Sequence, residues 1–345
     1  MNDFNLNHVR LRAGMYIGRL NSASGTNKSD GIYKLFRAIL NYASEEFLLG
    51  YGKLIDITVT DSSFRIRDYG RGIPYSELVY MVSGGDFPYV NGKLKDYGWI
   101  PRSVVCAISS DFRIESNNGN CCSYAHFKYG SIMECENKEQ IGNWTGTCIE
   151  FTPDTAIIGN YELDYSIIQE IVQTYSYLHR GLTYVLNGQE YLKPNGMLDL
   201  VNDKVGKECL YPPVYLADGW LEIAFTHRKE GKGDILSFVN GQPTPSGGTH
   251  QKALEKCLTR MVCMNEFKRG RLFSGLFAVV SLRIENPYGY PAIIEELYSQ
   301  DVNEENGPSI EEYISTCMRG IPQDVIDTLE GIASGRIPIQ DSATE

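Results

Sequence analysis

The chain has 345 residues, 42% of them hydrophobic and 22% charged, which is the balance of a folded protein with two domains or one large domain. It excludes disordered and low-complexity classes. No apolar run reaches the roughly 18 residues of a membrane-spanning helix, and the first twenty residues lack the apolar core of a signal peptide. Nine cysteines without a Cys-x-x-Cys pair, and five scattered histidines, argue against a zinc site or a disulfide framework. We therefore expect a cytoplasmic protein without membrane contact.

Charge divides the chain into two regions. The formal net charge is −11 at pH 7, and residues 285–345 alone hold thirteen acidic and two basic residues. Residues 1–284 hold thirty of each sign. Because this longer part is neutral, the acidic total does not speak against a nucleic-acid contact within it.

The first part of the chain predicts helices alternating with short strands. Apolar residues at helical spacing predict a helix over 31–49, with Gly50 as its stop signal. The residues Asn187-Gly188 predict a tight hairpin turn after a strand at 182–186. The other predicted elements are strands at 55–59, 64–67, 112–115, 121–129 and 147–151, helices at 102–109 and 164–179, and a long loop over 83–102.

The pattern restarts around Tyr211, which we take as a domain boundary between residues 1–210 and 211–345. The second part predicts strands at 220–227, 234–240 and 274–284 and helices near 250–263, 291–298, 309–318 and 322–333. Helices set against mixed strands in both parts indicate an α+β or α/β two-layer architecture, twice over.

A glycine motif over 68–74 (DYGRGIP) directly follows the second predicted strand. An acidic side chain at a strand end can accept a hydrogen bond from an exocyclic amine such as that of adenine, and neighbouring glycines let a ring approach the backbone closely. Taken alone, the motif also describes an ordinary turn.

Three further segments resemble the ATPase–transducer module of type IIA DNA topoisomerase B subunits (gyrase B and the ParE subunit of topoisomerase IV). They are the entry segment VRLRAGMYIG at 9–18, the strand TGTCIEF at 145–151, and FVNGQPTPSGGTH at 238–250. Together with the glycine motif they follow the family's order and spacing. The resemblance implies an α+β chain with a GHKL (Bergerat) two-layer α/β sandwich, followed by a ribosomal-protein-S5-like transducer domain.

The resemblance also implies site residues. The adenine-nucleotide positions of the family fall on Asp68, Gly70, Gly72, Ile73 and Thr147. A structural acid–base pair of the family falls on Glu46 and Arg71. We therefore predict an ion pair between those two side chains, with the charged groups within about 4 Å.

The positions that carry chemistry in the family differ here. Its E-x-x-x-N box places a general base and a magnesium ligand one helical turn apart, and these positions are Ala38 and Tyr42. Ala38 has no proton acceptor. A phenol is a poor magnesium ligand, because this cation prefers carboxylate, amide and water oxygens. Asn41, one residue away, and Glu45, two turns away, are weak replacements.

Two further catalytic parts are altered. The phosphate-binding glycine box corresponds to 95–103, where Gly98 is the one remaining glycine, Trp99 adds bulk and Pro101 has no N–H to donate. The family's γ-phosphate lysine corresponds to Ile294. We therefore predict a degenerate member with no catalytic residues, no ATP hydrolysis, no magnesium and no ATP-driven dimer. The remaining pocket is left open to ATP or another adenine nucleotide, to a different ligand, or to none.

A basic stripe is predicted on the helix after 238–250. Lys252, Lys256 and Arg260 recur every four residues, so they share one face. This face is a candidate DNA contact, because such stripes neutralise phosphates. The alternative is that it is an ordinary solvated helix face. His250 is expected to be structural.

The leading hypothesis is a non-hydrolysing gyrase-B-like homologue that acts as a binding or regulatory module related to DNA topology. The alternative is an ATP-binding N-terminal fragment of a divergent ATP-dependent type II DNA topoisomerase. A third hypothesis is an acidic protein that binds a topoisomerase or gyrase subunit and imitates DNA charge with residues 285–345. The residues after the module are too few for a DNA-cleaving domain, so we expect no DNA breakage by this chain alone if it is complete.

Overall fold

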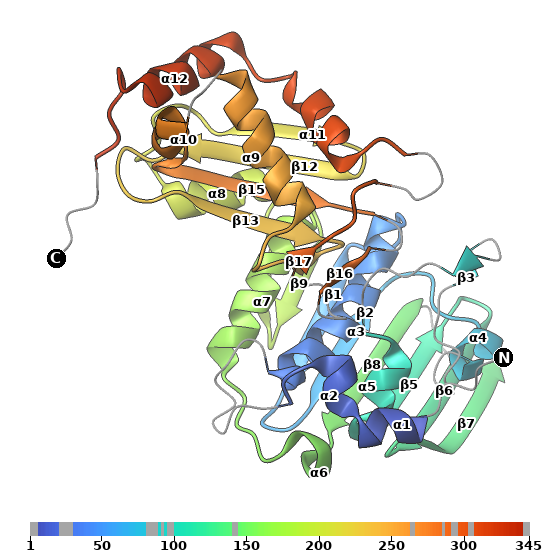
Figure 1. Cartoon of the computed structure of the whole chain (residues 1–345). Helices are drawn as coiled ribbons and strands as arrows, with labels where there is room; N and C mark the ends of the chain where they lie inside the picture. The colour runs from blue at the N-terminus through green and yellow to red at the C-terminus, as the bar shows by residue number, and fades with distance from the viewer. Residues whose placement is uncertain are drawn as a thin grey trace. The chain divides into compact units, whose positions relative to one another are not determined.

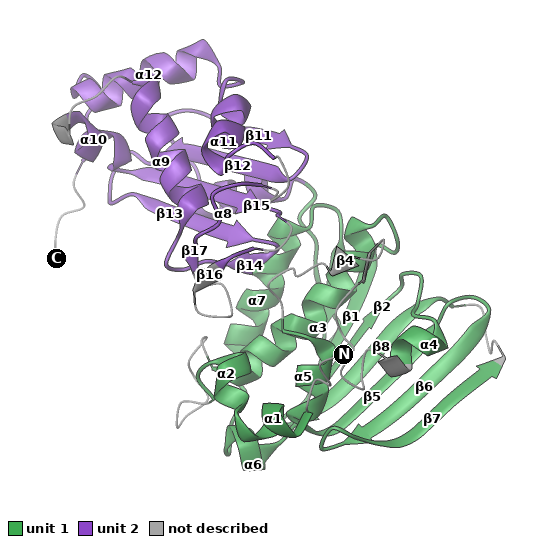
Figure 2. Cartoon of the chain, turned by 45° about the vertical axis from the view of Figure 1, so that its right-hand side comes forward, with its two compact units in different colours: residues 1–194 green, residues 195–345 purple. Residues whose placement is uncertain are grey.

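The chain folds into two compact units, residues 1–194 and 195–345 (Figure 2). The computed structural model describes residues 6–20, 30–80, 89–90, 93–94, 100–139, 144–262, 266–284, 287–290, 296–302 and 307–340. Helix α8 (Met197–Val205) contacts β12 (Leu221–His227) and therefore belongs to the second unit. The division thus falls earlier than the boundary that we placed at Tyr211.

The first unit is built on an eight-stranded sheet with the order β10-β9-β1-β2-β8-β5-β6-β7 (Figure 1). Strands β1 and β9 run parallel, and the other neighbouring pairs are antiparallel. The strands are β1 (Leu54–Val59), β2 (Phe64–Asp68), β5 (Ser109–Asn117), β6 (Cys121–Lys128), β7 (Ser131–Glu139), β8 (Gly146–Pro153), β9 (Thr183–Leu186) and β10 (Gln189–Tyr191), with a separate short pair β3 (Tyr89–Val90) and β4 (Lys93–Leu94). The helices are α1 (Leu6–Leu11), α2 (Ala13–Ile17), α3 (Gly31–Leu48), α4 (Tyr75–Tyr80), α5 (Arg102–Ala107), α6 (Thr155–Ile158) and α7 (Tyr165–Leu178).

Helices α3, α5 and α7 form the second layer of this unit. Helix α3 contacts β2 and β8, α5 contacts β5 and β8, and α7 contacts β9 and β10. Helix α3 ends just before Gly50, whose positive φ of 92° stops the helix. Under α3, the ring of Phe64 lies 5.3 Å from that of Phe36 and 5.1 Å from that of Phe151. This aromatic packing fixes α3 over β2 and β8.

The second unit is built on a five-stranded sheet with the order β11-β12-β15-β13-β14. Strands β13 and β15 run parallel, and the other neighbours are antiparallel. Besides α8 and β12, its elements are β11 (Val214–Asp218), β13 (Asp234–Val239), β14 (Gln242–Pro243), α9 (Thr249–Met261), α10 (Glu266–Phe273), β15 (Leu276–Leu282), β16 (Gly289–Tyr290), β17 (Glu296–Leu297), α11 (Ile310–Met318) and α12 (Gln323–Ser334).

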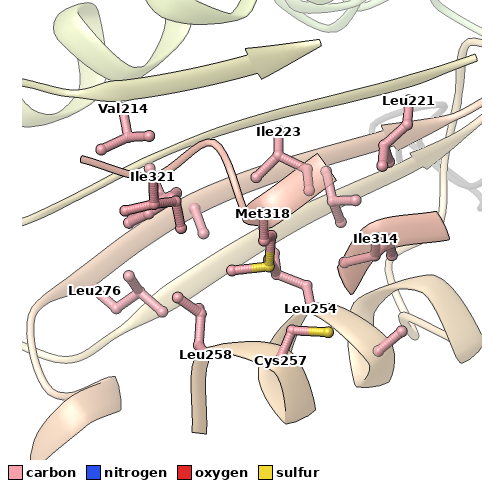
Figure 3. Close-up of a cluster of buried hydrophobic side chains, with 14 of the residues drawn as sticks. Val214, Leu221, Ile223, Leu254, Cys257, Leu258, Leu276, Ile314, Met318 and Ile321 are labelled. Atoms are coloured by element: carbon pink, nitrogen blue, oxygen red, sulfur yellow. The ribbon is translucent and has the colours of Figure 1, made fainter. Parts of the chain in front are cut away.

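The core of the second unit lies between this sheet and its helices (Figure 3). Leu254 and Leu258 of α9 point toward the strand residue Ile223, and Ile314 and Met318 of α11 complete the cluster. All five side chains are buried. Helix α11 begins with a capping box in which Ser309 and Glu312 exchange hydrogen bonds. The acidic C-terminal part of the chain therefore contributes helices to this core.

Most predicted elements are confirmed, including helix 31–49 and the hairpin, where Asn187 and Gly188 both have positive φ. The helix predicted near 291–298 is wrong in its described part, because Glu296–Leu297 pairs with Gly289–Tyr290 as a small sheet. Strand β7 was not predicted. It is an edge strand with mostly exposed side chains, so it lacks the alternation that marks a half-buried strand. Among the described residues, no helix combines the length and apolarity needed to span a bilayer.

Candidate functional site

The acidic residue of the glycine motif closes strand β2. Asp68 is its last residue, and only 6% of it is exposed. Its Oδ1 accepts hydrogen bonds from the backbone N–H of Gly70 at 2.9 Å and of Thr147 at 3.2 Å. Since Thr147 lies on β8, next to β2 in the sheet, this carboxylate joins the glycine turn to the neighbouring strand.

Ser116 is a second residue that joins the glycine turn to the sheet, and sequence reasoning missed it. Its Oγ accepts from the backbone N–H of Ile73 at 2.6 Å and lies 3.0 Å from Thr147 Oγ1. Ser116 and Thr147 face each other across β5 and β8. All five predicted nucleotide positions therefore meet at one end of the sheet. No local motif marks Ser116; only the register of two strands places it here.

Gly70 and Gly72 are explained by packing within the chain. A Cβ at Gly70 would lie 2.6 Å from Glu46 Oε2, and one at Gly72 would lie 2.1 Å from the carbonyl oxygen of Asn117. Gly72 also has a positive φ of 75°. The close approach of a ring is therefore not the reason for these glycines, because protein atoms occupy the space where a side chain would stand.

The electrostatics of Asp68 follow from its surroundings. Burial raises the pKa of Asp68 from its usual value to about 6. The two backbone N–H donors oppose this rise, the Glu46 charge adds to it, and the Arg102 charge lowers the pKa. Around pH 6, Asp68 thus titrates in a site that also holds a cation.

The predicted ion pair between Glu46 and Arg71 is confirmed. Arg71 Nη2 lies 2.9 Å from Glu46 Oε1, and Nε and the backbone N–H of Arg71 donate to Oε2 at 3.2 and 2.8 Å. Three hydrogen bonds on one carboxylate link α3 to the glycine turn. The Arg71 side chain is 49% exposed, so solvent screens its charge.

The two positions predicted to correspond to the family's general base and metal ligand, Ala38 and Tyr42, lie on α3. Ala38 is 2% exposed and packed in the core. The guanidinium carbon of Arg102 lies 4.0 Å from the centroid of the Tyr42 ring, and Arg102 is 7% exposed. Sequence reasoning missed Arg102, because this contact joins two helices far apart in sequence.

The residues present do not fit magnesium. At the predicted ligand position Tyr42 offers a phenol, and a buried cation already lies on its ring; a divalent cation there would meet like charge. In the described part of the chain, no group of three or more His, Cys, Asp or Glu side chains could hold a metal.

The two candidate replacements, Asn41 and Glu45, interact with other residues of the chain. Asn41 is buried, and its Oδ1 accepts a hydrogen bond from the Tyr175 hydroxyl, so this amide is turned into the core. The charge of Glu45 raises the pKa of Arg71. Glu45 lies about two helical turns from Ala38 on α3. Residues 95–99 of the altered glycine box and Ile294 lie outside the described residues.

The basic stripe in the second unit is paired with glutamates. Lys252 Nζ lies 3.3 Å from Glu296 Oε1, and Lys256 Nζ lies 2.6 Å from Glu311 Oε2. Arg260 donates to the other oxygen of Glu311. These contacts lower the pKa of Glu311, with the Lys256 hydrogen bond as the largest cause. Two cations thus share one carboxylate from the acidic C-terminal part, and the DNA contact stays a prediction.

His250, expected to be structural, is fully buried at the start of α9. Its Nε2 lies 3.2 Å from Thr244 Oγ1. Burial lowers its pKa to about 4, so the imidazole is neutral at pH 7.

The chain is similar to bacterial topoisomerase subunits. The family model for DNA gyrase B matches residues 183–290. The B subunit of DNA topoisomerase 4 from Borreliella burgdorferi is 34% identical over 296 residues, covering 82% of this chain and 48% of that protein. The Streptococcus pneumoniae protein of the same name is 30% identical, covering 76% and 44%. The chain thus spans about half the length of these relatives.

The 43K ATPase domain of Thermus thermophilus gyrase B, solved in complex with an aminocoumarin, has the same fold. Its TM-score is 0.73 at 24% identity, covering 97% of this chain and 95% of that one. This agrees with the two-layer arrangement of α3, α5 and α7 on a mixed sheet. The chain therefore belongs to the family of gyrase B and the topoisomerase IV ParE proteins, with the α+β GHKL fold of their ATPase module.

Proposed function

We propose that this chain is an adenine-nucleotide-binding member of the family that does not hydrolyse ATP and acts as a binding or regulatory module related to DNA topology. The observation that carries the proposal is a contrast within one site. Asp68 accepts two backbone hydrogen bonds at Oδ1 that hold it in place, whereas Ala38 and Tyr42 occupy the positions of the family's general base and metal ligand.

Adenine recognition is supported by the geometry of Asp68. Among the described residues, both backbone donors to this carboxylate go to Oδ1. Oδ2 is then the acceptor for an exocyclic amine. Ser116 and Thr147 hold the strand end beside it through their hydroxyl contact. The similarity to a solved ATPase domain supports the same class of ligand.

The absence of hydrolysis is proposed from the chemistry of α3. A general base must lie within hydrogen-bond distance of the attacking water, and the methyl group of Ala38 accepts no proton. A magnesium ion held at the position of Tyr42 would also stabilise the charge that develops on a transferred phosphoryl group. Tyr42 provides no metal ligand of the usual kind.

Titration calorimetry with adenosine, ADP, ATP and a non-hydrolysable analogue, combined with a phosphate-release assay, tests this function. We expect binding that does not depend on the γ-phosphate, no turnover above background, and loss of binding in Asp68→Ala. Turnover by the unmodified protein that disappears in Asp68→Asn would refute the non-hydrolysing function. Dimerisation induced by ATP, measured by light scattering, would also contradict it.

The alternative function is that of an ATP-binding N-terminal part of a divergent ATP-dependent type II topoisomerase. It is favoured by the relatives, because this chain covers only 48% and 44% of their length. DNA and a second topoisomerase or gyrase subunit would then be its partners. Expressing the whole gene that contains this chain, purifying what binds to it, and assaying ATP-dependent DNA relaxation distinguishes the two functions.

A further inference from the structure

A buried cation lies at the α3 side of the site. Arg102 is the first residue of α5, and its guanidinium carbon is 4.0 Å from the centroid of the Tyr42 ring on α3. Only 7% of Arg102 is exposed. Burying a charge is costly unless other groups compensate it, and the electron-rich face of an aromatic ring is one such group.

The cation also acts on the adenine side of the site. Its charge lowers the pKa of Asp68, against the larger effect of burial. Arg102 thus contacts the Tyr42 ring at 4.0 Å, and its charge also acts on Asp68. Its position follows from packing, because α3 and α5 contact each other and both contact β8.

A guanidinium offers phosphate what a metal would otherwise supply. It keeps its charge at all working pH values, and its planar array of N–H groups matches the oxygens of a phosphate in pairs. Magnesium, by contrast, does not fit beside the ring of Tyr42, where it would meet the charge of Arg102. The positive charge beside the Tyr42 ring is thus supplied by the Arg102 side chain and not by a bound metal ion.

We propose that the guanidinium of Arg102, held on the ring of Tyr42, takes the electrostatic place of magnesium, so that the site binds the phosphates of an adenine nucleotide without a metal. This inference rests on the proposed function. It adds phosphate recognition by a named residue and predicts that chelators leave the affinity unchanged.

The test is calorimetry with adenosine and ADP in EDTA and in magnesium. The unmodified protein should bind ADP at least about tenfold more tightly than adenosine in EDTA, the scale of one lost charged hydrogen bond, and magnesium should not strengthen binding. Arg102→Gln should lose this preference while still binding adenosine. Arg102→Lys should keep part of it, because the charge remains without the planar fork.

Two variants of the ring and one control complete the design. Tyr42→Phe keeps the ring face and should keep the preference for ADP, whereas Tyr42→Leu should reduce it. The control, Arg113→Gln, removes an exposed arginine paired with Asp111 on β5 and should change neither affinity. Retained adenosine binding shows that each variant is folded.

Equal affinities for adenosine and ADP in EDTA would overturn this inference and leave the proposed function standing. Tighter ADP binding only in magnesium would overturn it as well. So would tighter adenosine binding by Arg102→Gln, because the arginine would then occupy the ligand's place. No binding of adenosine or ADP by the unmodified protein would overturn both proposals.

Discussion

Two sides of one site differ in what their residues do for the fold. On the glycine-turn side, Asp68 binds the backbone of Gly70 and Thr147, and Glu46 binds the backbone and side chain of Arg71. On the α3 side, Ala38 is packed in the core, and the ring of Tyr42 contacts the guanidinium of Arg102. The polar side chains on the glycine-turn side thus hold separate elements together.

The difference teaches how far the residues of such a site indicate a ligand. A retained side chain with a scaffold role is explained by folding alone, so its presence does not establish a ligand. The α3 side is more informative, because the contact between Tyr42 and Arg102 holds a buried charge there. Substituting residues on each side and measuring stability, binding and turnover tests this contrast.

The largest expected effect is a pH-dependent stability carried by Asp68. Burial raises its pKa to about 6, so between about pH 4 and pH 6 the folded chain keeps a proton that the unfolded chain releases. The free energy of unfolding should therefore fall as pH rises through this window, by about 3 kcal/mol at most. Denaturant unfolding at several pH values measures this. Asp68→Asn should lack this component, and equal slopes for both proteins would contradict it.

Ser116→Ala should destabilise the first unit by about 2 kcal/mol. The substitution leaves the partly buried N–H of Ile73 without its acceptor and removes the partner of the buried Thr147 hydroxyl. Ser110→Ala is the matched control. Its hydroxyl makes one longer, partly buried bond of 3.2 Å to the carbonyl of Thr152, and its loss should cost less. Equal losses of stability in the two variants would show that the junction at Ser116 has no special weight.

Glu46→Gln should cost about 1 kcal/mol, a modest value because Arg71 is half exposed and its charge is screened. Part of this loss comes from the backbone N–H of Arg71, which donates to the same carboxylate. Thermal unfolding in low and high salt measures both parts. A loss that disappears in high salt would mean that only the charge pair contributes.

The second unit offers the same kind of contrast on α9, where Lys256 and Arg260 are neutralised by Glu311. Glu311→Gln should free both cations and strengthen binding to duplex DNA a few-fold at low salt, with a steeper salt dependence. Fluorescence anisotropy with a labelled duplex measures this. Glu330→Gln, an exposed residue of α12, makes the same change in net charge. An equal gain in that control would assign the effect to net charge alone.

The smallest expected effect is on turnover. Under the proposed function, Ala38→Glu combined with Tyr42→Asn supplies a general base and an amide on α3 and leaves the loop at 95–103 and Ile294 unchanged. We expect no ATP hydrolysis above background in a phosphate-release assay with magnesium. Turnover in this double variant would show that the α3 side alone separates this chain from an active enzyme.

The sequence by itself determined the local elements and the family. Helix 31–49 and the Asn187-Gly188 hairpin follow from periodicity and turn chemistry, which act between residues close in the chain. The pairing of Glu46 with Arg71 was also predicted, because the family's motif places both residues. These features depend on residues within short segments, so the sequence of each segment is enough to predict them.

Only the tertiary structure decided the contacts between distant segments. Strand register brought Ser116 to Thr147, helix packing set Arg102 on Tyr42, and the fold of the acidic C-terminal part brought Glu311 to α9. Residue spacing does not predict these contacts, because each one joins two segments that are distant in the sequence and are brought together by tertiary packing. The hydrogen-bond partner of Asn41 was decided in the same way, since its direction depends on where α7 packs.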